Sequence, residues 1–203
     1  MQRILTLGSL VFIGIFGLLT SCSFSPVNIE PNNIYMLNST PTLRPHKSPN
    51  RKIYLLVTAP ISNSIFNTTS MAYSVKPHQI GYFAKNRWAE TPTQMLHQLI
   101  IQTLQKSGHF NQVGSASTMN HFNYILNTQL IILEQDYTTH PYTLKLKIRA
   151  QLINIATNDM IASREFSIEQ NLNGKGPYAG VVAANLATEI VLRQLTTFCI
   201  NHL

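Results

Sequence analysis

One cysteine near the N-terminus lies in a context suited to covalent lipid attachment. The segment Leu19 to Cys22 follows an apolar, uncharged run that begins after Arg3. A basic residue, an apolar stretch and small residues before a cleavage point are typical of a secretory signal peptide. Cys22 supplies the side chain that can form a thioether with a diacylglycerol. We therefore expect residues 1–21 to be removed and a tri-acylated Cys22 to anchor the mature chain, because stable anchoring needs more than one acyl chain.

The same apolar run could instead form an N-terminal membrane anchor that is never cut. It extends from Ile4 to Leu19, which is 16 residues, whereas a helix that spans a bilayer needs about 20. The shorter length favours a signal peptide.

Residue sets suited to catalysis are scarce in the rest of the chain. There is no GxSxG, no phosphate-binding loop, no HExxH and no cysteine pair for zinc. Asp136 and His140 could join a serine in a hydrolase site, but both lie at the end of a predicted strand, where polar residues are common. Seven histidines are present, and no two have the spacing of a metal site. We therefore expect no enzyme and assign no catalytic residue, metal or cofactor.

A row of basic residues has two interpretations. Lys145, Lys147 and Arg149 alternate with apolar residues, which places all three on one face of a strand. The favoured interpretation is a solvated sheet face partly neutralised by Glu165 and Glu169 from the next strand, where exposed ion pairs contribute little. The other is a site for lipid headgroups or a protein partner.

A second group combines aromatic residues with an arginine. Trp88, the only tryptophan, lies near Tyr82 and Arg87, and we favour a packing role for it over a role in a protein interface. The speculative partner or lipid interface therefore comprises Tyr82, Arg87, Trp88, Lys145, Lys147 and Arg149.

Length and charge limit the class of protein. Without residues 1–21, 182 residues remain, with 14 Lys and Arg against 8 Asp and Glu. This length fits one domain, which we place at 34–203 behind a lipidated tether at 22–33. The positive charge favours anionic partners such as lipid headgroups or an acidic protein face, and the expected compartment argues against nucleic acid. Cys199, the only other thiol, lies on an apolar stripe and is expected to be buried.

Periodicity predicts the elements that carry these residues. Strands are expected at 34–37, 52–59, 71–74, 79–84, 124–137, 142–155 and 160–170. A three-residue turn at 157–159 would keep the even positions of the last two strands on one face, with Lys147 opposite Glu169 and Gln151 opposite Glu165.

Two helices are also predicted. Thr91-Pro92-Thr93-Gln94 is a helix start with a capping box, and Gly108 ends that helix; its apolar face comprises Met95, Leu96, Leu99, Ile100, Thr103 and Leu104. The second helix runs from about 178 to 198, with an apolar stripe of Val182, Leu186, Ile190, Val191, Leu195 and Phe198. The fold expected is α+β, with a mostly antiparallel β-sheet and two amphipathic helices packed on one face.

A series of short motifs resembles a known family. Ile34-Tyr35-Met36-Leu37, Met71-Ala72-Tyr73, Tyr82-Phe83-Ala84, Arg87-Trp88-Ala89, Pro92, Met95-Leu96 and Gly108-His109-Phe110 with Val113 occur in that order. Their order and spacing resemble the ABC-type transport auxiliary lipoprotein family, which includes the PqiC-like and YmbA-like lipoproteins of Gram-negative bacteria.

The resemblance implies an accessory role in lipid trafficking across the envelope. Such lipoproteins are anchored in the outer membrane, face the periplasm and work with an MCE-domain protein and an ABC permease and ATPase. The resemblance brings no catalytic residues. Ser23 after Cys22, in place of the Asp that retains many lipoproteins in the inner membrane, also favours the outer membrane.

Three functional hypotheses follow from these observations. The leading one is an auxiliary lipoprotein that docks a periplasmic MCE assembly at the outer membrane. The alternative is an outer-membrane assembly lipoprotein of the lipopolysaccharide-export type, which would associate with a β-barrel. The third is a periplasmic enzyme on a lipid tether, which would need a polar pocket joining Asp136, His140 and a nucleophile.

Overall fold

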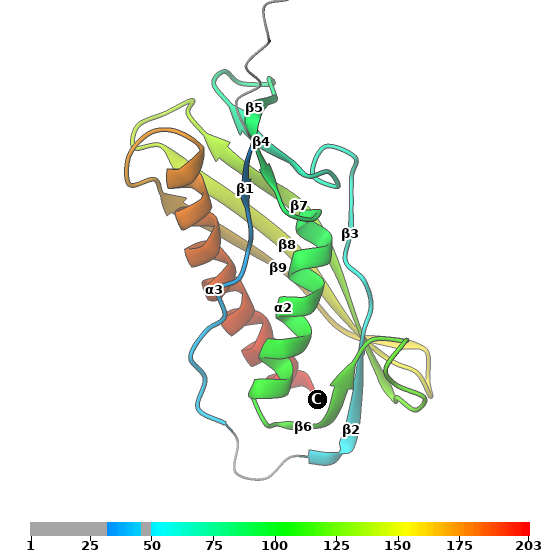
Figure 1. Cartoon of the computed structure of the whole chain (residues 1–203). Coiled ribbons are helices and arrows are strands. Elements are labelled where there is room, and N and C mark those ends of the chain that lie inside the picture. Colours follow the sequence, from blue (N-terminus) through cyan, green and yellow to red (C-terminus); the bar gives the residue numbers. More distant parts are fainter. Residues whose placement is uncertain (1–31, 46–49) are drawn as a thin grey trace, which may run out of the picture. The chain divides into compact units, whose positions relative to one another are not determined.

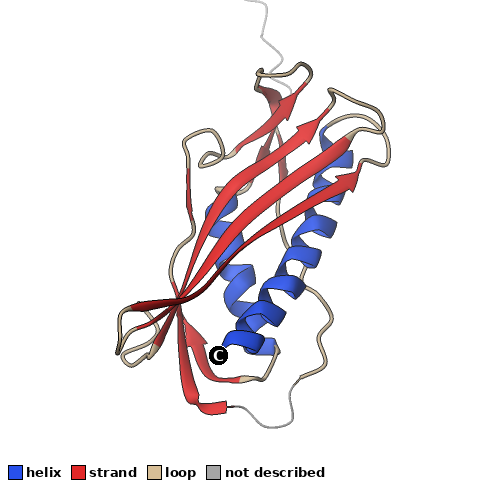
Figure 2. Ribbon diagram, turned by 180° about the vertical axis from the view of Figure 1, so that it is seen from behind, coloured by secondary structure: helices blue, strands red, loops and turns tan. Residues whose placement is uncertain are grey.

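A computed structural model of the chain describes residues 32–45 and 50–203. Cys22 and the predicted signal peptide lie outside these residues. The described part contains eleven elements: β1 (Asn33–Tyr35), β2 (Asn50–Val57), β3 (Ile61–Ser62), β4 (Ser70–Ser74), β5 (Gly81–Trp88), α2 (Pro92–Lys106), β6 (Phe110–Gly114), β7 (Tyr124–Asp136), β8 (Thr143–Asn154), β9 (Asp159–Asn171) and α3 (Pro177–His202). The strands form one sheet, and both helices cover the same face of it (Figures 1 and 2).

The sheet is mixed, which corrects the expectation of a mostly antiparallel one. β7, β8 and β9 form an antiparallel meander, and β4 pairs antiparallel with β5. The other pairings are parallel: β1 with β5, β2 with β6, and β2, β3 and β4 with β7. Thirteen residues make β7 long enough to pair with three short strands along one edge. Alternation in the sequence predicts strands, but it does not reveal which distant strands pair.

The first helix forms as its sequence predicts. The backbone N–H of Gln94 donates to Thr91 Oγ1 over 3.4 Å, and the backbone N–H of Thr91 donates to Gln94 Oε1 over 3.1 Å, which completes the capping box. The helix ends at Lys106, and Gly108 follows with a φ of 65° that favours glycine. The predicted apolar face is confirmed, because all six of its residues are buried.

The β8–β9 hairpin differs from the prediction in its turn and register. The turn spans 155–158, with Asn158 at a φ of 58°, and Ile161 is an extra residue in β9 that forms a bulge. The bulge restores the parity that a four-residue turn would break, so even positions beyond it lie on the core side, whereas Met160, before the bulge, is exposed. Glu165 consequently lies opposite Arg149 rather than Gln151, and Glu169 lies opposite Lys145 rather than Lys147.

The predicted apolar stripe of the last helix is partly wrong. Val191, Leu195 and Phe198 are buried in α3, but Val182 and Leu186 are exposed. Ala183, Ala184 and Ala187 take their place against the sheet, since small side chains let the helix approach closely. The buried position of Cys199 is confirmed. Among the described residues, no helix has the length and hydropathy needed to cross a bilayer.

Candidate functional site

The basic row lies on the face of the sheet that the helices leave uncovered. Lys147 Nζ is 3.3 Å from a carboxylate oxygen of Glu165, and the Arg149 guanidinium is 3.1 Å from the other oxygen. These two cations hold the pKa of Glu165 below its usual range. Lys145 instead forms an ion pair with the buried carboxylate of Asp136. The contacts agree with the interpretation of a partly neutralised sheet face.

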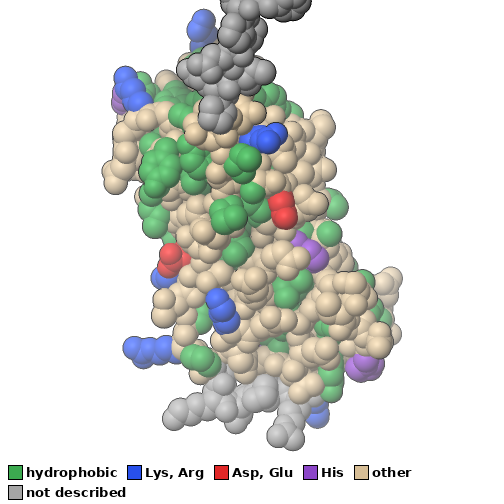
Figure 3. All heavy atoms as spheres, viewed as in Figure 1, with side chains coloured by type: hydrophobic (Ala, Val, Ile, Leu, Met, Phe, Trp, Pro, Cys, Tyr) green, Lys and Arg blue, Asp and Glu red, His purple; other side chains and the backbone are tan. Residues whose placement is uncertain are grey.

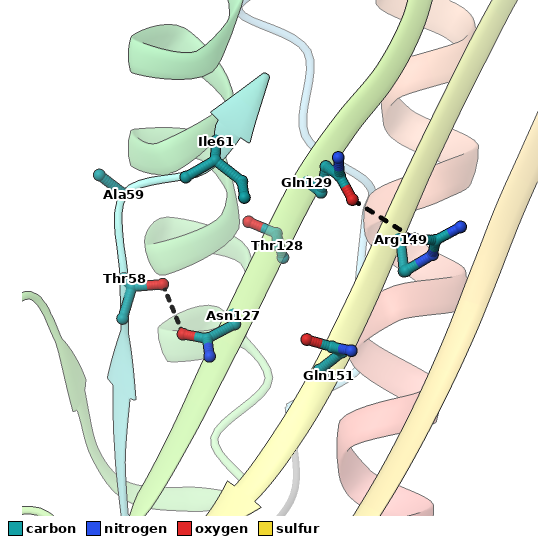
Figure 4. Close-up of a pocket in the computed structure, with 8 residues that line it drawn as sticks. All are labelled: Thr58, Ala59, Ile61, Asn127, Thr128, Gln129, Arg149 and Gln151. Atoms are coloured by element: carbon teal, nitrogen blue, oxygen red, sulfur yellow. Dashed lines mark hydrogen bonds between the residues drawn. The ribbon is translucent and has the colours of Figure 1, made fainter. Parts of the chain in front are cut away.

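A polar notch opens on this uncovered face, beside Arg149. It has a volume of about 320 Å³ and lies beside β7, at the segment that connects β2 to β3. It is lined by Thr58, Ala59, Ile61, Asn127, Thr128, Gln129, Arg149 and Gln151 (Figure 4). Thr58 Oγ1 donates to Asn127 Oδ1 over 2.9 Å, and Arg149 donates to Gln129 Oε1 over 3.5 Å.

One residue that lines the notch turns its side chain away from the opening. Thr128 lies opposite the buried Ala150, so its side chain faces the helices, whereas Asn127 and Gln129 lie opposite Gln151 and Arg149 on the uncovered face. The Thr128 hydroxyl is buried without a hydrogen-bond partner among the described residues and is not accessible from the notch. Amides, hydroxyls and one guanidinium equip the notch to bind polar groups, but they supply no nucleophile with an adjacent base. Its chemistry is that of recognition.

The proposed hydrolase pair does not assemble into a catalytic site. Asp136 Oδ1 accepts hydrogen bonds from the backbone N–H and hydroxyl of Thr138 over 2.7 and 2.6 Å. Burial opposes ionisation of Asp136, but the hydrogen bonds from Lys145 and Thr138 outweigh it and lower the pKa of the carboxyl. His140 is exposed, and its ring centroid lies 4.0 Å from that of Tyr142. Asp136 thus serves a structural ion pair.

A larger cavity beside Asp136 also lacks a catalytic arrangement. It has a volume of about 480 Å³ and includes Ser74, His78 and Lys145, but not His140. Among the described residues, no group of three metal-ligating side chains occurs. The cavity therefore brings Asp136 and Ser74 together but leaves out His140, which the enzyme hypothesis requires.

The aromatic and arginine group is separated from the basic row. Trp88 is buried in the core, as its packing interpretation predicts. Tyr82 and Arg87 are exposed on β5, where the Tyr82 hydroxyl donates to the carbonyl of Ile65 over 3.2 Å. Strands β4 and β7 lie between β5 and β8 in the sheet. The six candidate residues consequently do not form one surface.

An extended segment after β1 is fastened to the last helix by one amide. Asn185 Oδ1 accepts the backbone N–H groups of Asn38 and Ser39 over 2.9 and 3.1 Å. Asn185 Nδ2 donates to the carbonyl of Met36 over 3.1 Å. Because all three bonds reach the backbone of 36–39, they fix the position of β1 and its extension along α3.

Sequence reasoning missed an apolar surface beside this segment. Ile34, Met36, Tyr178, Val182 and Leu186 are all exposed and line one shallow cavity of about 440 Å³, and we call this set the β1–α3 surface. Figure 3 shows apolar side chains gathered over β1 and the first half of α3. A signal was present in the sequence, because the first half of α3 contains more apolar residues than one helix face can bury.

Comparison with known proteins places the fold. The crystal structure of protein XCC0632 from Xanthomonas campestris matches with a TM-score of 0.77 and 20% identity, over 84% of this chain and 95% of that one. An uncharacterized protein matches with a TM-score of 0.66 and 16% identity, over 84% and 99%. A hypothetical protein from Chlamydia trachomatis matches with a TM-score of 0.51 and 11% identity, over 74% and 97%. At these identities the likeness shows the fold alone.

The family is shown by sequence. A search against curated proteins gave no match. The family model described as the ABC-type transport auxiliary lipoprotein component matches residues 35–196, which covers most of the described chain, including all of α2 and most of α3. The protein therefore belongs to the ABC-type transport auxiliary lipoprotein component family.

Proposed function

We propose that this chain is a non-enzymatic subunit of an MCE-type ABC lipid transport system. In this proposal Cys22 anchors the protein in the outer membrane, and the folded domain docks a periplasmic MCE assembly that works with an ABC permease and ATPase. The observation that carries the proposal is the family match over residues 35–196. The predicted lipid attachment at Cys22 and the serine after it support the anchor and the choice of membrane.

The uncovered sheet face fits the docking role better than the other polar surfaces. It presents basic side chains whose charge is only partly neutralised, and the notch beside Arg149 is lined by the amides of Asn127, Gln129 and Gln151. Interfaces that form and separate resemble ordinary protein surface in polarity. A partner loop that carries amide or acidic side chains would find hydrogen-bond donors at Arg149 and Gln151.

Site-specific cross-linking in the native envelope tests this proposal. A photoreactive amino acid replaces Gln151 in the full-length chain, and a matched variant carries it at Gln98, which is exposed on α2 on the other face. We expect an MCE-domain protein to be cross-linked from position 151 and much less from position 98.

Two results would count against the proposal. Failure at both positions to recover an MCE-domain protein would count against docking by this domain. Recovery of an outer-membrane β-barrel would favour the alternative role in lipopolysaccharide-export assembly.

A further inference from the structure

The β1–α3 surface is large for an exposed apolar patch on a small domain. The exposed fractions of its side chains are 56 % for Ile34, 52 % for Met36, 65 % for Tyr178, 40 % for Val182 and 46 % for Leu186. Together they expose on the order of 400 Å² of mostly apolar surface, and patches of this size are often functional. Something other than water is expected to cover them.

The surface lies close to the predicted anchor along the chain. Ile34 lies twelve positions after Cys22, and even a fully extended chain of that length spans only about 40 Å. The acyl chains on Cys22 would therefore hold Ile34 within about one domain diameter of the bilayer.

Basic residues occupy the loops at the same end of the domain. Loops 75–80 and 172–176 lie at the end where β1 begins in both views (Figures 1 and 2). They carry Lys76 and Lys175, whose side chains are exposed. Basic residues near an anionic bilayer are attracted to its headgroups. An apolar surface flanked by cations, with a tyrosine among its aliphatic side chains, has the composition of an interfacial membrane contact.

The anchor favours the bilayer over a second copy of the chain as the occupant. A stable interface between proteins buries about 800 Å² on each partner, so a second copy would also have to cover polar residues around this surface. A domain already held at the membrane by lipid needs far less area, because its anchor keeps the surface near the bilayer.

We propose that the β1–α3 surface rests on the lipid bilayer that holds Cys22, with its five apolar side chains at the headgroup level and Lys76 and Lys175 near lipid phosphates. This inference rests on the lipid anchor of the proposed function. Because the helices cover the face of the sheet opposite the notch, the contact leaves the notch open to the periplasm. The contact thus orients the domain for docking.

Lipid-borne quenching of single-cysteine labels tests the contact. The full-length, acylated protein is reconstituted at low density in vesicles of phosphatidylethanolamine and phosphatidylglycerol, some of which carry a quencher on their acyl chains. An environment-sensitive fluorophore is attached at Val182→Cys, at Leu186→Cys one turn later, and at a control, Ser163→Cys, which is exposed on the uncovered face. Cys199 is 0 % exposed, and burial raises the pKa of its thiol, so it stays unlabelled.

We expect quenching at positions 182 and 186 to exceed that at position 163 by at least twofold, with a blue-shifted emission only at the first two. Equal quenching at all three positions would overturn the membrane contact. A blue-shifted emission at positions 182 and 186 that disappears when the protein is diluted within the vesicles would also overturn it, in favour of contact with a second copy of the chain. Circular dichroism of each variant verifies the fold, and the two α3 positions serve as independent probes.

Vesicle flotation separates this inference from the proposed function. Protein that fails to float with vesicles, and whose mass shows no acyl chains, would refute the anchor and with it both proposals. Protein that floats but shows uniform quenching would refute the membrane contact alone.

Discussion

Replacement of Gly180 by alanine should destabilise the protein, although the same change stabilises most helices. Gly180 lies in the first turns of α3, against Gln135 of β7. An added Cβ would lie 1.9 Å from Gln135 Cδ and 2.1 Å from its Nε2. Gln135 is 2 % exposed. Its Oε1 accepts from the Tyr137 hydroxyl over 2.7 Å, and its Nε2 donates to the carbonyl of Pro177 over 3.4 Å. The side chain therefore cannot move aside without losing both bonds.

The competing free energies can be compared. Alanine gains about 1 kcal/mol over glycine in a helix interior. Overpacking costs about 1–3 kcal/mol, and a displaced, buried amide with unmade hydrogen bonds costs a further 1–3 kcal/mol or so. We expect Gly180→Ala to lower the free energy of unfolding by about 1–5 kcal/mol. For a domain of this size, a loss of about 2 kcal/mol corresponds to a fall in Tm of roughly 4–8 °C.

A double-mutant cycle isolates the contact. Urea unfolding followed by circular dichroism is measured for Gly180→Ala, for Gln135→Ala and for the two combined. Removal of the Gln135 amide leaves room for the new methyl group, so Gly180→Ala should become neutral or stabilising in that background. The coupling should be about 2 kcal/mol, well above the error of non-interacting pairs. A gain in stability from Gly180→Ala in the parental chain, or a coupling near zero, would refute this account of how α3 packs on β7.

Three further predictions concern other parts of the fold. Asn185→Ala should release the backbone of 36–39, since three hydrogen bonds are lost, and hydrogen exchange there should rise more than tenfold; no change relative to Thr197→Ala would contradict it. Asp136→Asn should lower the free energy of unfolding at pH 7 by about 1–2 kcal/mol. The change removes the carboxylate charge that pairs with Lys145 and leaves one of the donors on Lys145 or Thr138 without an acceptor. The folded-state pKa of Asp136 is lowered, so its contribution to stability is present above its unfolded pKa of about 3.9 and is lost as the pH falls through the folded value. Urea unfolding of the parental chain and the variant at pH 7 and pH 3 should therefore show a stability difference that shrinks in acid. A constant stability difference would contradict this. Cys199 should resist maleimide in the native state at pH 8 and react fully in urea, because burial raises the pKa of its thiol; rapid native labelling would show that the end of α3 opens.

Local signals determined what the sequence could predict. The capping box at Thr91 and the end at Gly108 depend on residues within one turn of each helix terminus, so α2 could be placed accurately. The β8–β9 turn depends on local residues as well, but its four-residue length and the bulge at Ile161 together leave the register two positions from the predicted one. The parity of the strands survived, which is why the basic row was assigned to the correct kind of face.

Non-local pairing and helix orientation lay beyond these signals. The parallel strands along β7 come from segments up to about seventy residues away, and no alternation in one strand specifies its neighbour. On α3, Val181 and Val182 are adjacent and equally apolar, yet only Val181 is buried. The choice follows from Gly180 and the alanines, which permit close approach to the sheet on their side of the helix.

The exposure of Val182 is therefore a direct consequence of how α3 packs. Close approach through Gly180, Ala184 and Ala187 turns Val182 and Leu186 away from the sheet, and a helix needed only for the core would have tolerated polar residues there. Asn185, between them, is polar and binds the segment after β1, so Ile34 and Met36 come to lie along the same cavity. The apolar surface is thus assembled from two segments that one amide holds together. Weakening either the Gly180 contact or the hydrogen bonds of Asn185 should move these two segments apart. Either change therefore tests the membrane contact without altering the side chains that make it.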